Sequence, residues 1–155
     1  MAHSFTALQI HAIFSTKNRS RILTADARER LFPFMGGVVR DMKGSALIVN
    51  GVEDHVHVLA TLPATLSVSD FMRELKAVSS LWAKDHLSIG DEFGWQTGYA
   101  AFSVSKSISE TVRQYIARQG EHHRNKTFEE EYLAYLKAHE IEYDPRFVFE
   151  QEIVG

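Results

Sequence analysis

Apolar and polar residues follow two different periods along this chain, and the changes of period predict a βαββαβ order of elements. Residues 5–14 and 95–104 are apolar, aromatic and rich in β-prone side chains, as is typical of strands. Residues 46–52 and 55–62 are two further strand-like segments separated by a pair of acidic residues. Their short separation predicts a hairpin.

Helical periodicity occupies the segments between the predicted strands. Over residues 25–43, apolar side chains recur every three or four positions, starting after Thr24 as a capping residue and ending at Gly44. Residues 67–70, Ser-Val-Ser-Asp, form a capping box that predicts a second amphipathic helix to about Leu87.

Two further capping boxes predict helices in the C-terminal part. The box at residues 107–110 is expected to start a helix that carries Tyr115 and Gln119 on one face and ends at Gly120. Another box opens a helix over about residues 127–139. The whole order predicts an α+β, ferredoxin-like βαββαβ sandwich. It has an antiparallel sheet with helices on one face, followed by C-terminal helices that carry the tyrosine.

The chain has the size of one domain. It has 155 residues, 45% of them hydrophobic, and contains no internal repeat or linker-like tract. We therefore expect a single domain over residues 1–155, with a core over about residues 5–126 and an acidic helix and tail over about residues 127–155.

Residue usage restricts the chemistry and the location. The chain has eight histidines and no cysteine, which excludes disulfides, thiolate metal sites and cysteine nucleophiles. The sequence has no signal-peptide pattern and no apolar run of the roughly twenty residues that span a bilayer. The expectation is a soluble, cytoplasmic protein without a membrane partner.

Charge is unevenly distributed. The net charge is −3, but residues 129–155 hold eight acids and two bases, while the rest of the chain holds fifteen bases and twelve acids. The acidic run of residues 129–131 is interpreted as the polar start of a helix. A modestly basic body is compatible with nucleic-acid binding without requiring it.

A histidine pair is the first candidate for chemistry. His55 and His57 point to the same side of a predicted strand, with Cα atoms roughly 6.5 Å apart, so their imidazoles can converge on one divalent cation. The same spacing also arises when two histidines occupy the solvated face of a half-buried strand. Val56 and Val58, on the opposite phase, fit the core under both interpretations.

Tyr115 and Gln119 are the second candidate pair. Four residues apart, they share a face of the predicted helix. A tyrosine hydroxyl can attack phosphorus to give a covalent phosphotyrosine, and a glutamine oxygen can bind a hard cation. Taken alone, such a pair is more often a core contact and a surface amide than a catalytic pair.

Four blocks of sequence carry a family resemblance. They are residues 11–19 (HAIFSTKNR), 51–57 (GVEDHVH), 95–105 (WQTGYAAFSVS) and 115–124 (YIARQGEHHR). With these blocks in this order, the chain resembles the IS200/IS605-like single-tyrosine transposases of the HUH endonuclease class, including the REP-associated tyrosine transposases.

The resemblance implies an enzyme that cleaves and rejoins single-stranded DNA with hairpin ends. It implies Tyr115 as the nucleophile of a 5′-phosphotyrosine intermediate, and His55, His57 and Gln119 as ligands of Mg²⁺ or Mn²⁺. It also implies a homodimer, in which the tyrosine helix of one subunit can complete the active site of the other. The strand predicted over residues 95–104 is our candidate for edge-to-edge pairing.

Several basic residues are candidates for contact with DNA phosphates, although each is equally compatible with a solvated surface position. They are Lys17, Arg19, Arg73, Lys76, Arg118, His122 and Arg124.

Two alternatives remain open from sequence. The chain could be a non-catalytic hairpin- or repeat-DNA-binding protein derived from such a transposase. It could also be a metal-dependent phosphoesterase that uses the same histidines, with Tyr115 in a structural role.

Overall fold

Four strands of the chain form one antiparallel sheet in the order β2-β3-β1-β4. The computed structural model describes residues 3–90 and 92–149. The elements are β1 (Leu8–Ser15), η1 (Lys17–Arg19), α1 (Ala25–Asp41), β2 (Ser45–Gly51), β3 (His55–Leu62), α2 (Val68–His86), β4 (Ala100–Val104), η2 (Lys106–Ile108), α3 (Ser109–Ala117), α4 (Gln119–His122) and α5 (Phe128–Ala138). The predicted α+β class and antiparallel sheet are confirmed.

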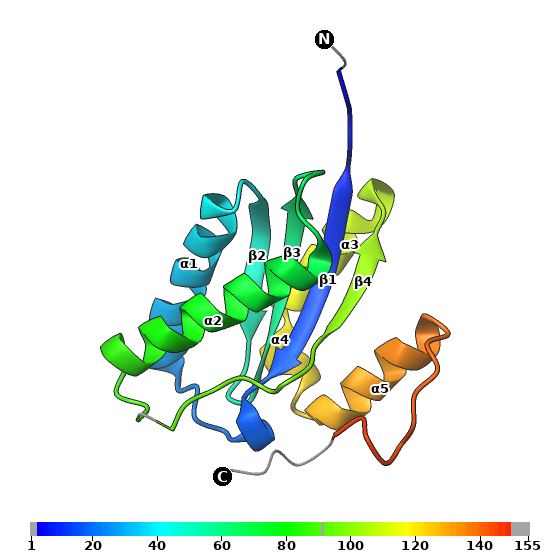
Figure 1. Cartoon of the computed structure of the whole chain (residues 1–155). Helices are drawn as coiled ribbons and strands as arrows, with labels where there is room; N and C mark the ends of the chain where they lie inside the picture. The colour runs from blue at the N-terminus through cyan, green and yellow to red at the C-terminus, as the bar shows by residue number, and fades with distance from the viewer. Residues whose placement is uncertain (1–2, 91, 150–155) are drawn as a thin grey trace.

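The helices divide between the two faces of the sheet. Helices α1 and α2 lie across one face, while α3 and α4 lie behind the strands in Figure 1, and α5 lies beside β4. Strand alternation explains this division. Phe14 and Val58 are buried in the cluster that includes α1 and α2, whereas Leu59 and Val104 are buried with Ile116 of α3.

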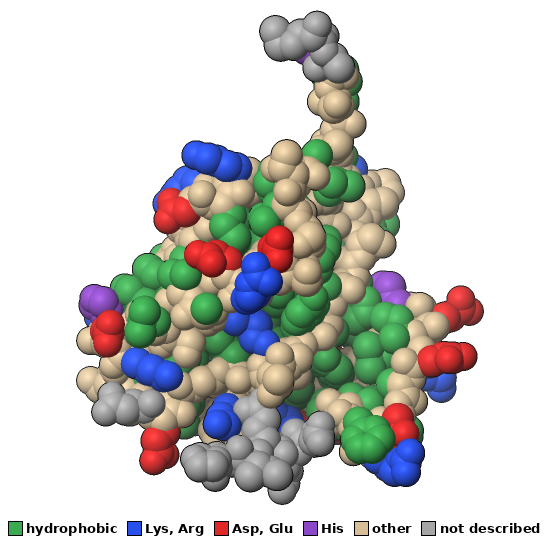
Figure 2. Space-filling view, in the orientation of Figure 1, with side chains coloured by type: hydrophobic (Ala, Val, Ile, Leu, Met, Phe, Trp, Pro, Cys, Tyr) green, Lys and Arg blue, Asp and Glu red, His purple; other side chains and the backbone are tan. Residues whose placement is uncertain are grey.

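The surface over α1 and α2 carries mixed charge. Lys and Arg side chains are interspersed there with Asp and Glu (Figure 2). Among the residues that the structure describes, no helix has the length and hydrophobicity needed to cross a membrane.

Three of the four predicted helix starts are confirmed. The hydroxyls of Thr24, Ser67 and Thr127 each accept a backbone N–H of the following turn. The start predicted at residues 107–110 is wrong, because η2 occupies residues 106–108 and α3 begins at Ser109 without a side-chain cap.

The strand predicted over residues 95–104 is shorter than expected. Only Ala100–Val104 is paired as β4, and Trp95 forms an isolated bridge with Thr16. The backbone carbonyls of residues 96–98, between this bridge and β4, accept hydrogen bonds from a side chain of α2. The ammonium of Lys76 on α2 donates to three successive carbonyls between residues 96 and 98, at 2.6, 3.2 and 2.9 Å.

The single helix predicted for Tyr115 and Gln119 is wrong. Helix α3 ends at Ala117, Arg118 leaves helical geometry at φ −100° and ψ 25°, and α4 begins at Gln119. The side-chain amide of Asn50 on β2 donates to the carbonyls of residues 116 and 117, at 2.9 and 3.3 Å. These bonds satisfy the end of α3, so the chain can turn without losing hydrogen bonds.

Candidate metal and nucleophile site

The two histidines of β3 lie on the face of the sheet that carries α3 and α4. The side chains of His55 and His57 are fully buried, and Val56 and Val58 are buried on the opposite face. The interpretation that placed the histidine pair on a solvated face is therefore wrong.

Each of these imidazoles is oriented by a partner on Nδ1. His55 Nδ1 lies 2.7 Å from Oδ1 of Asp54, and His57 Nδ1 lies 2.7 Å from Nε2 of His11 on β1. Both Nε2 atoms are consequently left to face the space beneath α3, α4 and α5. This is the arrangement that outer partners impose on metal-binding histidines.

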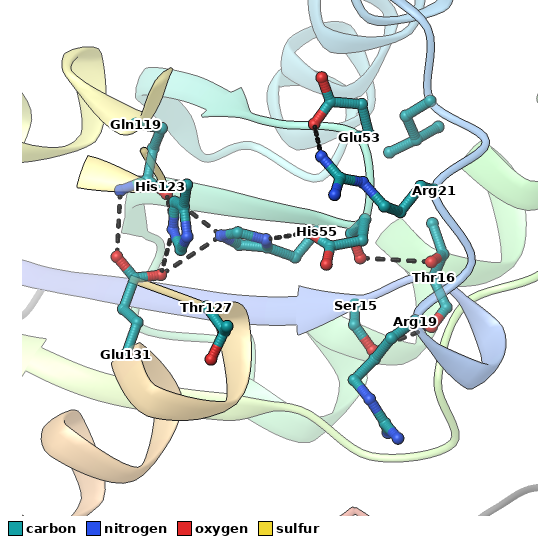
Figure 3. Close-up of polar contacts among 12 residues, drawn as sticks. Ser15, Thr16, Arg19, Arg21, Glu53, His55, Gln119, His123, Thr127 and Glu131 are labelled. Carbon is teal, nitrogen blue, oxygen red and sulfur yellow. Dashed lines mark hydrogen bonds and ion pairs between the residues drawn. The ribbon is translucent and has the colours of Figure 1, made fainter. Parts of the chain in front are cut away.

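A carboxylate from α5 reaches the same space. Glu131 is 1% exposed, and its Oε1 lies 2.9 Å from His57 Nε2, 3.3 Å from His55 Nε2 and 3.2 Å from His123 Nε2. Figure 3 shows Glu131, His123 and Gln119 grouped around His55. Residues 129–131 are the acidic first turn of α5, as predicted, but Glu131 itself is buried and faces the histidines.

Tyr115 and Gln119 meet the histidines within one chain, despite the turn between α3 and α4. Gln119 Oε1 lies 3.1 Å from the Nε2 atoms of both His55 and His123. The Tyr115 hydroxyl donates to Oε2 of Glu131, and its ring lies 6.2 Å from the His57 ring. The four residues predicted from the sequence are thus brought together.

The electrostatics of the two β3 histidines differ. Burial opposes the protonated form of His55, but the hydrogen bonds and negative charges of Asp54 and Glu131 outweigh burial and raise its pKa to about 9. Burial dominates at His57 and lowers its pKa to about 4, with Glu131 opposing this shift.

The carboxyl and phenol pKa values also shift in opposite directions. Hydrogen bonds from the surrounding histidines overcome the effect of burial and hold the pKa of Glu131 far below its usual range. Burial and the adjacent Glu131 carboxylate raise the pKa of Tyr115 well above its ordinary value.

The donor set fits a divalent cation. The ligand atoms of His55, His57, His123 and Glu131 all lie within 4.8 Å of one another. Imidazole nitrogens with carboxylate and amide oxygens can together bind a divalent cation, and no thiolate is present to select a softer metal.

Sequence reasoning missed Glu131 and His123 as members of this cluster. One signal for Glu131 was available, because it lies between Phe128 and Tyr135 at helical spacing, where an apolar side chain would be expected. His123 follows the tyrosine segment, where its position depended on the unforeseen turn at Arg118.

The predicted DNA contacts are distributed over different parts of the molecule. Arg19 pairs with Glu129 at 3.1 Å, Arg73 pairs with Asp70 at 2.8 Å, and Lys76 holds carbonyls of residues 96–98. The ring of His122 stacks on Tyr115 with centroids 4.3 Å apart, and Arg118 lies exposed between α3 and α4.

Two other residues predicted to contact DNA, Lys17 and Arg124, line cavities. Lys17 borders a cavity of about 720 Å³ between η1 and α2. Arg124 borders another of about 800 Å³, with Arg19, Arg21 and Lys126 on the same walls. Asp54 and His123 also line the second cavity, so it adjoins the histidine cluster.

The fold and site define a small α+β domain in which a tyrosine and a potential metal site are joined. The sequence model of the family described as "Transposase IS200 like" matches residues 4–119. The chain belongs to this family, and it is therefore a transposase, an enzyme that cuts DNA.

Individual relatives agree with this assignment. The chain is 28% identical over 127 residues to the transposase for insertion sequence element IS200 of Salmonella typhimurium, covering 77% of this chain and 81% of that protein. It is 23% identical over 119 residues to the ISDra2 transposase TnpA of Deinococcus radiodurans, covering 72% and 84%.

A solved structure shares the fold. The crystal structure of a putative transposase from Deinococcus radiodurans superposes with a TM-score of 0.61 at 19% identity. The superposition covers 77% of this chain and 96% of the other.

Proposed function

We propose that this transposase cleaves and rejoins single-stranded DNA through a 5′-phosphotyrosine intermediate on Tyr115. The observation that supports the proposal is the meeting of Tyr115 with Gln119, His55 and His57 within one chain, although they come from two distant segments. A nucleophile beside a set of cation ligands is what phosphoryl transfer requires.

His55, His57 and Gln119 would hold a Mg²⁺ or Mn²⁺ ion, which would supply positive charge to the non-bridging oxygens of the scissile phosphate. The Tyr115 oxygen would form a bond to phosphorus as the bond to the 3′-oxygen breaks. The products are a 5′-phosphotyrosine linkage and a 3′-hydroxyl. A 3′-hydroxyl from a second strand can later displace the tyrosine, so the exchange needs no nucleotide cofactor.

Partners and assembly belong to the same proposal. The DNA would be a single strand flanked by hairpins. The homodimer would pair through an edge of the sheet, where β4 lies next to β1 alone. A monomeric mass measured under conditions of full activity would contradict the dimer.

The decisive experiment incubates the protein with single-stranded DNA carrying hairpins and Mn²⁺, followed by denaturing electrophoresis. We expect a covalent protein–DNA adduct that Tyr115→Phe abolishes. Tyr143→Phe is the matched control, because Tyr143 lies exposed outside the cluster. Binding without cleavage would favour the non-catalytic alternative. Metal-dependent cleavage that survives Tyr115→Phe without an adduct would favour the phosphoesterase.

A further inference from the structure

Glu131 is a buried anion whose partners are unusual. It is 1% exposed, and its ion-pair partners among residues 3–90 and 92–149 are all histidines. A buried charge persists only when it is paired or binds a cation. The ligand atoms of His55, His57, His123 and Glu131 lie within 4.8 Å of one another, so a cation placed among them would contact the carboxylate as well as the imidazoles.

The distances around Oε1 match those between ligands of one cation. Oε1 lies 2.9, 3.3 and 3.2 Å from the Nε2 atoms of His57, His55 and His123. Gln119 Oε1 lies 3.1 Å from two of the same nitrogens. Two ligands bound at right angles, each about 2.1 Å from a Mg²⁺ ion, are separated by about 3 Å.

The second carboxylate oxygen points to the nucleophile. Glu131 Oε2 accepts the hydroxyl of Tyr115 and lies 3.3 Å from Nε2 of Gln119. One side chain therefore contacts the predicted nucleophile, the predicted amide ligand and the histidines.

Helix α5 holds Glu131 firmly in this position. Thr127 and Glu130 complete a capping box at its start, and Phe128 and Tyr132 pack into a buried cluster with Phe102 of β4. The family match ends at residue 119, so this carboxylate comes from outside the matched region.

We infer that Glu131 has a bridging role between the metal site and the nucleophile. Its Oε1, with His123, completes the cation site formed by His55, His57 and Gln119. Its Oε2 holds the Tyr115 hydroxyl beside that site. The inference rests on the proposed metal site and adds to it an anionic ligand from α5.

The first test is titration of the full-length, DNA-free protein with Mn²⁺ in a calorimeter. Glu131→Gln keeps the shape and removes the charge, and we expect at least about tenfold weaker binding. Glu130→Gln is the matched control on the same helix, since glutamine also serves in a capping box. We expect it to bind Mn²⁺ like the parent.

The outcomes separate this inference from the proposed function. If His55→Ala abolishes Mn²⁺ binding while Glu131→Gln binds as tightly as the parent, the bridging role is refuted and the metal site stands. Tighter binding by Glu131→Gln also refutes it, because Glu131 would then compete with the cation. If His55→Ala binds normally, the metal site itself fails.

Two further measurements cover the remaining parts of the inference. Electron–nuclear double resonance of Mn²⁺ bound to the parent protein, with glutamate carboxyls labelled with ¹³C, should give the coupling of a directly bound carboxylate. Its absence overturns the inference even if Glu131→Gln does not fold. At saturating Mn²⁺, Glu131→Gln should still form adduct at least about tenfold more slowly than the parent. Full recovery would show that Oε2 does not position Tyr115.

Discussion

His11 and His57 share a hydrogen bond between their rings, from Nε2 of one to Nδ1 of the other, at 2.7 Å. Both side chains are buried, and burial holds the pKa of His11 well below its ordinary value. With both rings neutral, one nitrogen carries the shared proton. In the metal-free site, neutral His57 donates its Nε2–H to Glu131, so its Nδ1 accepts from His11. A cation bound to His57 Nε2 would reverse this hydrogen bond, and Nδ1 would then donate to His11.

Replacing His11 should therefore weaken metal binding without touching a ligand. His11→Leu removes the acceptor, and we expect Mn²⁺ affinity to fall about 10- to 100-fold. His11→Gln can place an amide oxygen near the former Nε2 and should retain most of the affinity. Equal losses in the two variants, measured by calorimetry, would show that His11 contributes only packing.

Metal affinity should also depend on pH over an unusual range. His55 has a pKa raised to about 9, so between its ordinary value of 6.5 and pH 9 the metal-free site holds a proton that binding must expel. Mn²⁺ affinity should consequently rise by about tenfold per pH unit across this range. An ordinary histidine would stop contributing above about pH 7.

Calorimetry at pH 7.5 in two buffers with different ionisation enthalpies measures this proton directly. About one proton should be released per Mn²⁺ bound. Asp54→Asn removes one cause of the raised pKa, so it should reduce the release. Affinity that is constant from pH 7 to pH 9 would contradict the prediction.

The cap of α5 should link stability to the metal site. Thr127→Ala removes a side-chain cap and should cost about 1 kcal/mol, equivalent to a fall of about 2–4 °C in Tm. Because α5 carries Glu131, Mn²⁺ binding should weaken as well. Ser67→Ala removes the corresponding cap of α2 and should lower Tm similarly without changing Mn²⁺ affinity. Equal effects of both variants on Mn²⁺ affinity would exclude a specific role of α5.

Local sequence signals predicted the parts of the fold that depend on neighbours in the chain. The caps at Thr24, Ser67 and Thr127 are each completed within three residues, and the shared face of His55 and His57 follows from strand alternation. The order of the elements also predicted the α+β class and the antiparallel sheet.

The remaining features depend on contacts between distant segments. At the turn after α3, the last carbonyls of the helix accept hydrogen bonds from the side-chain amide of Asn50, more than sixty residues earlier. No pattern around Tyr115 predicts this contact. His11 reaches His57 only through the register of β1 and β3. The position of Glu131 in the cluster depends on how α5 packs against the sheet, which the local sequence does not show.

The cavity beside the histidine cluster should carry part of the DNA contact. Arg124 lies exposed at its edge, with Arg19, Arg21 and Lys126 on the same walls. Arg19 and Arg21 form ion pairs with Glu129 and Glu53, which reduces the positive charge that they offer to DNA. Arg124 should therefore make the larger individual contribution to phosphate binding.

Arg124→Gln should weaken binding of single-stranded DNA a few-fold and reduce the slope of log K against log salt by about 0.7, the value for one phosphate contact. Arg40→Gln, on α1, is the control and should leave both quantities unchanged. Fluorescence anisotropy over a salt series measures them. If Arg124→Gln lowered affinity with an unchanged slope, the loss would arise from local structure, because removal of a phosphate contact must also release fewer counterions.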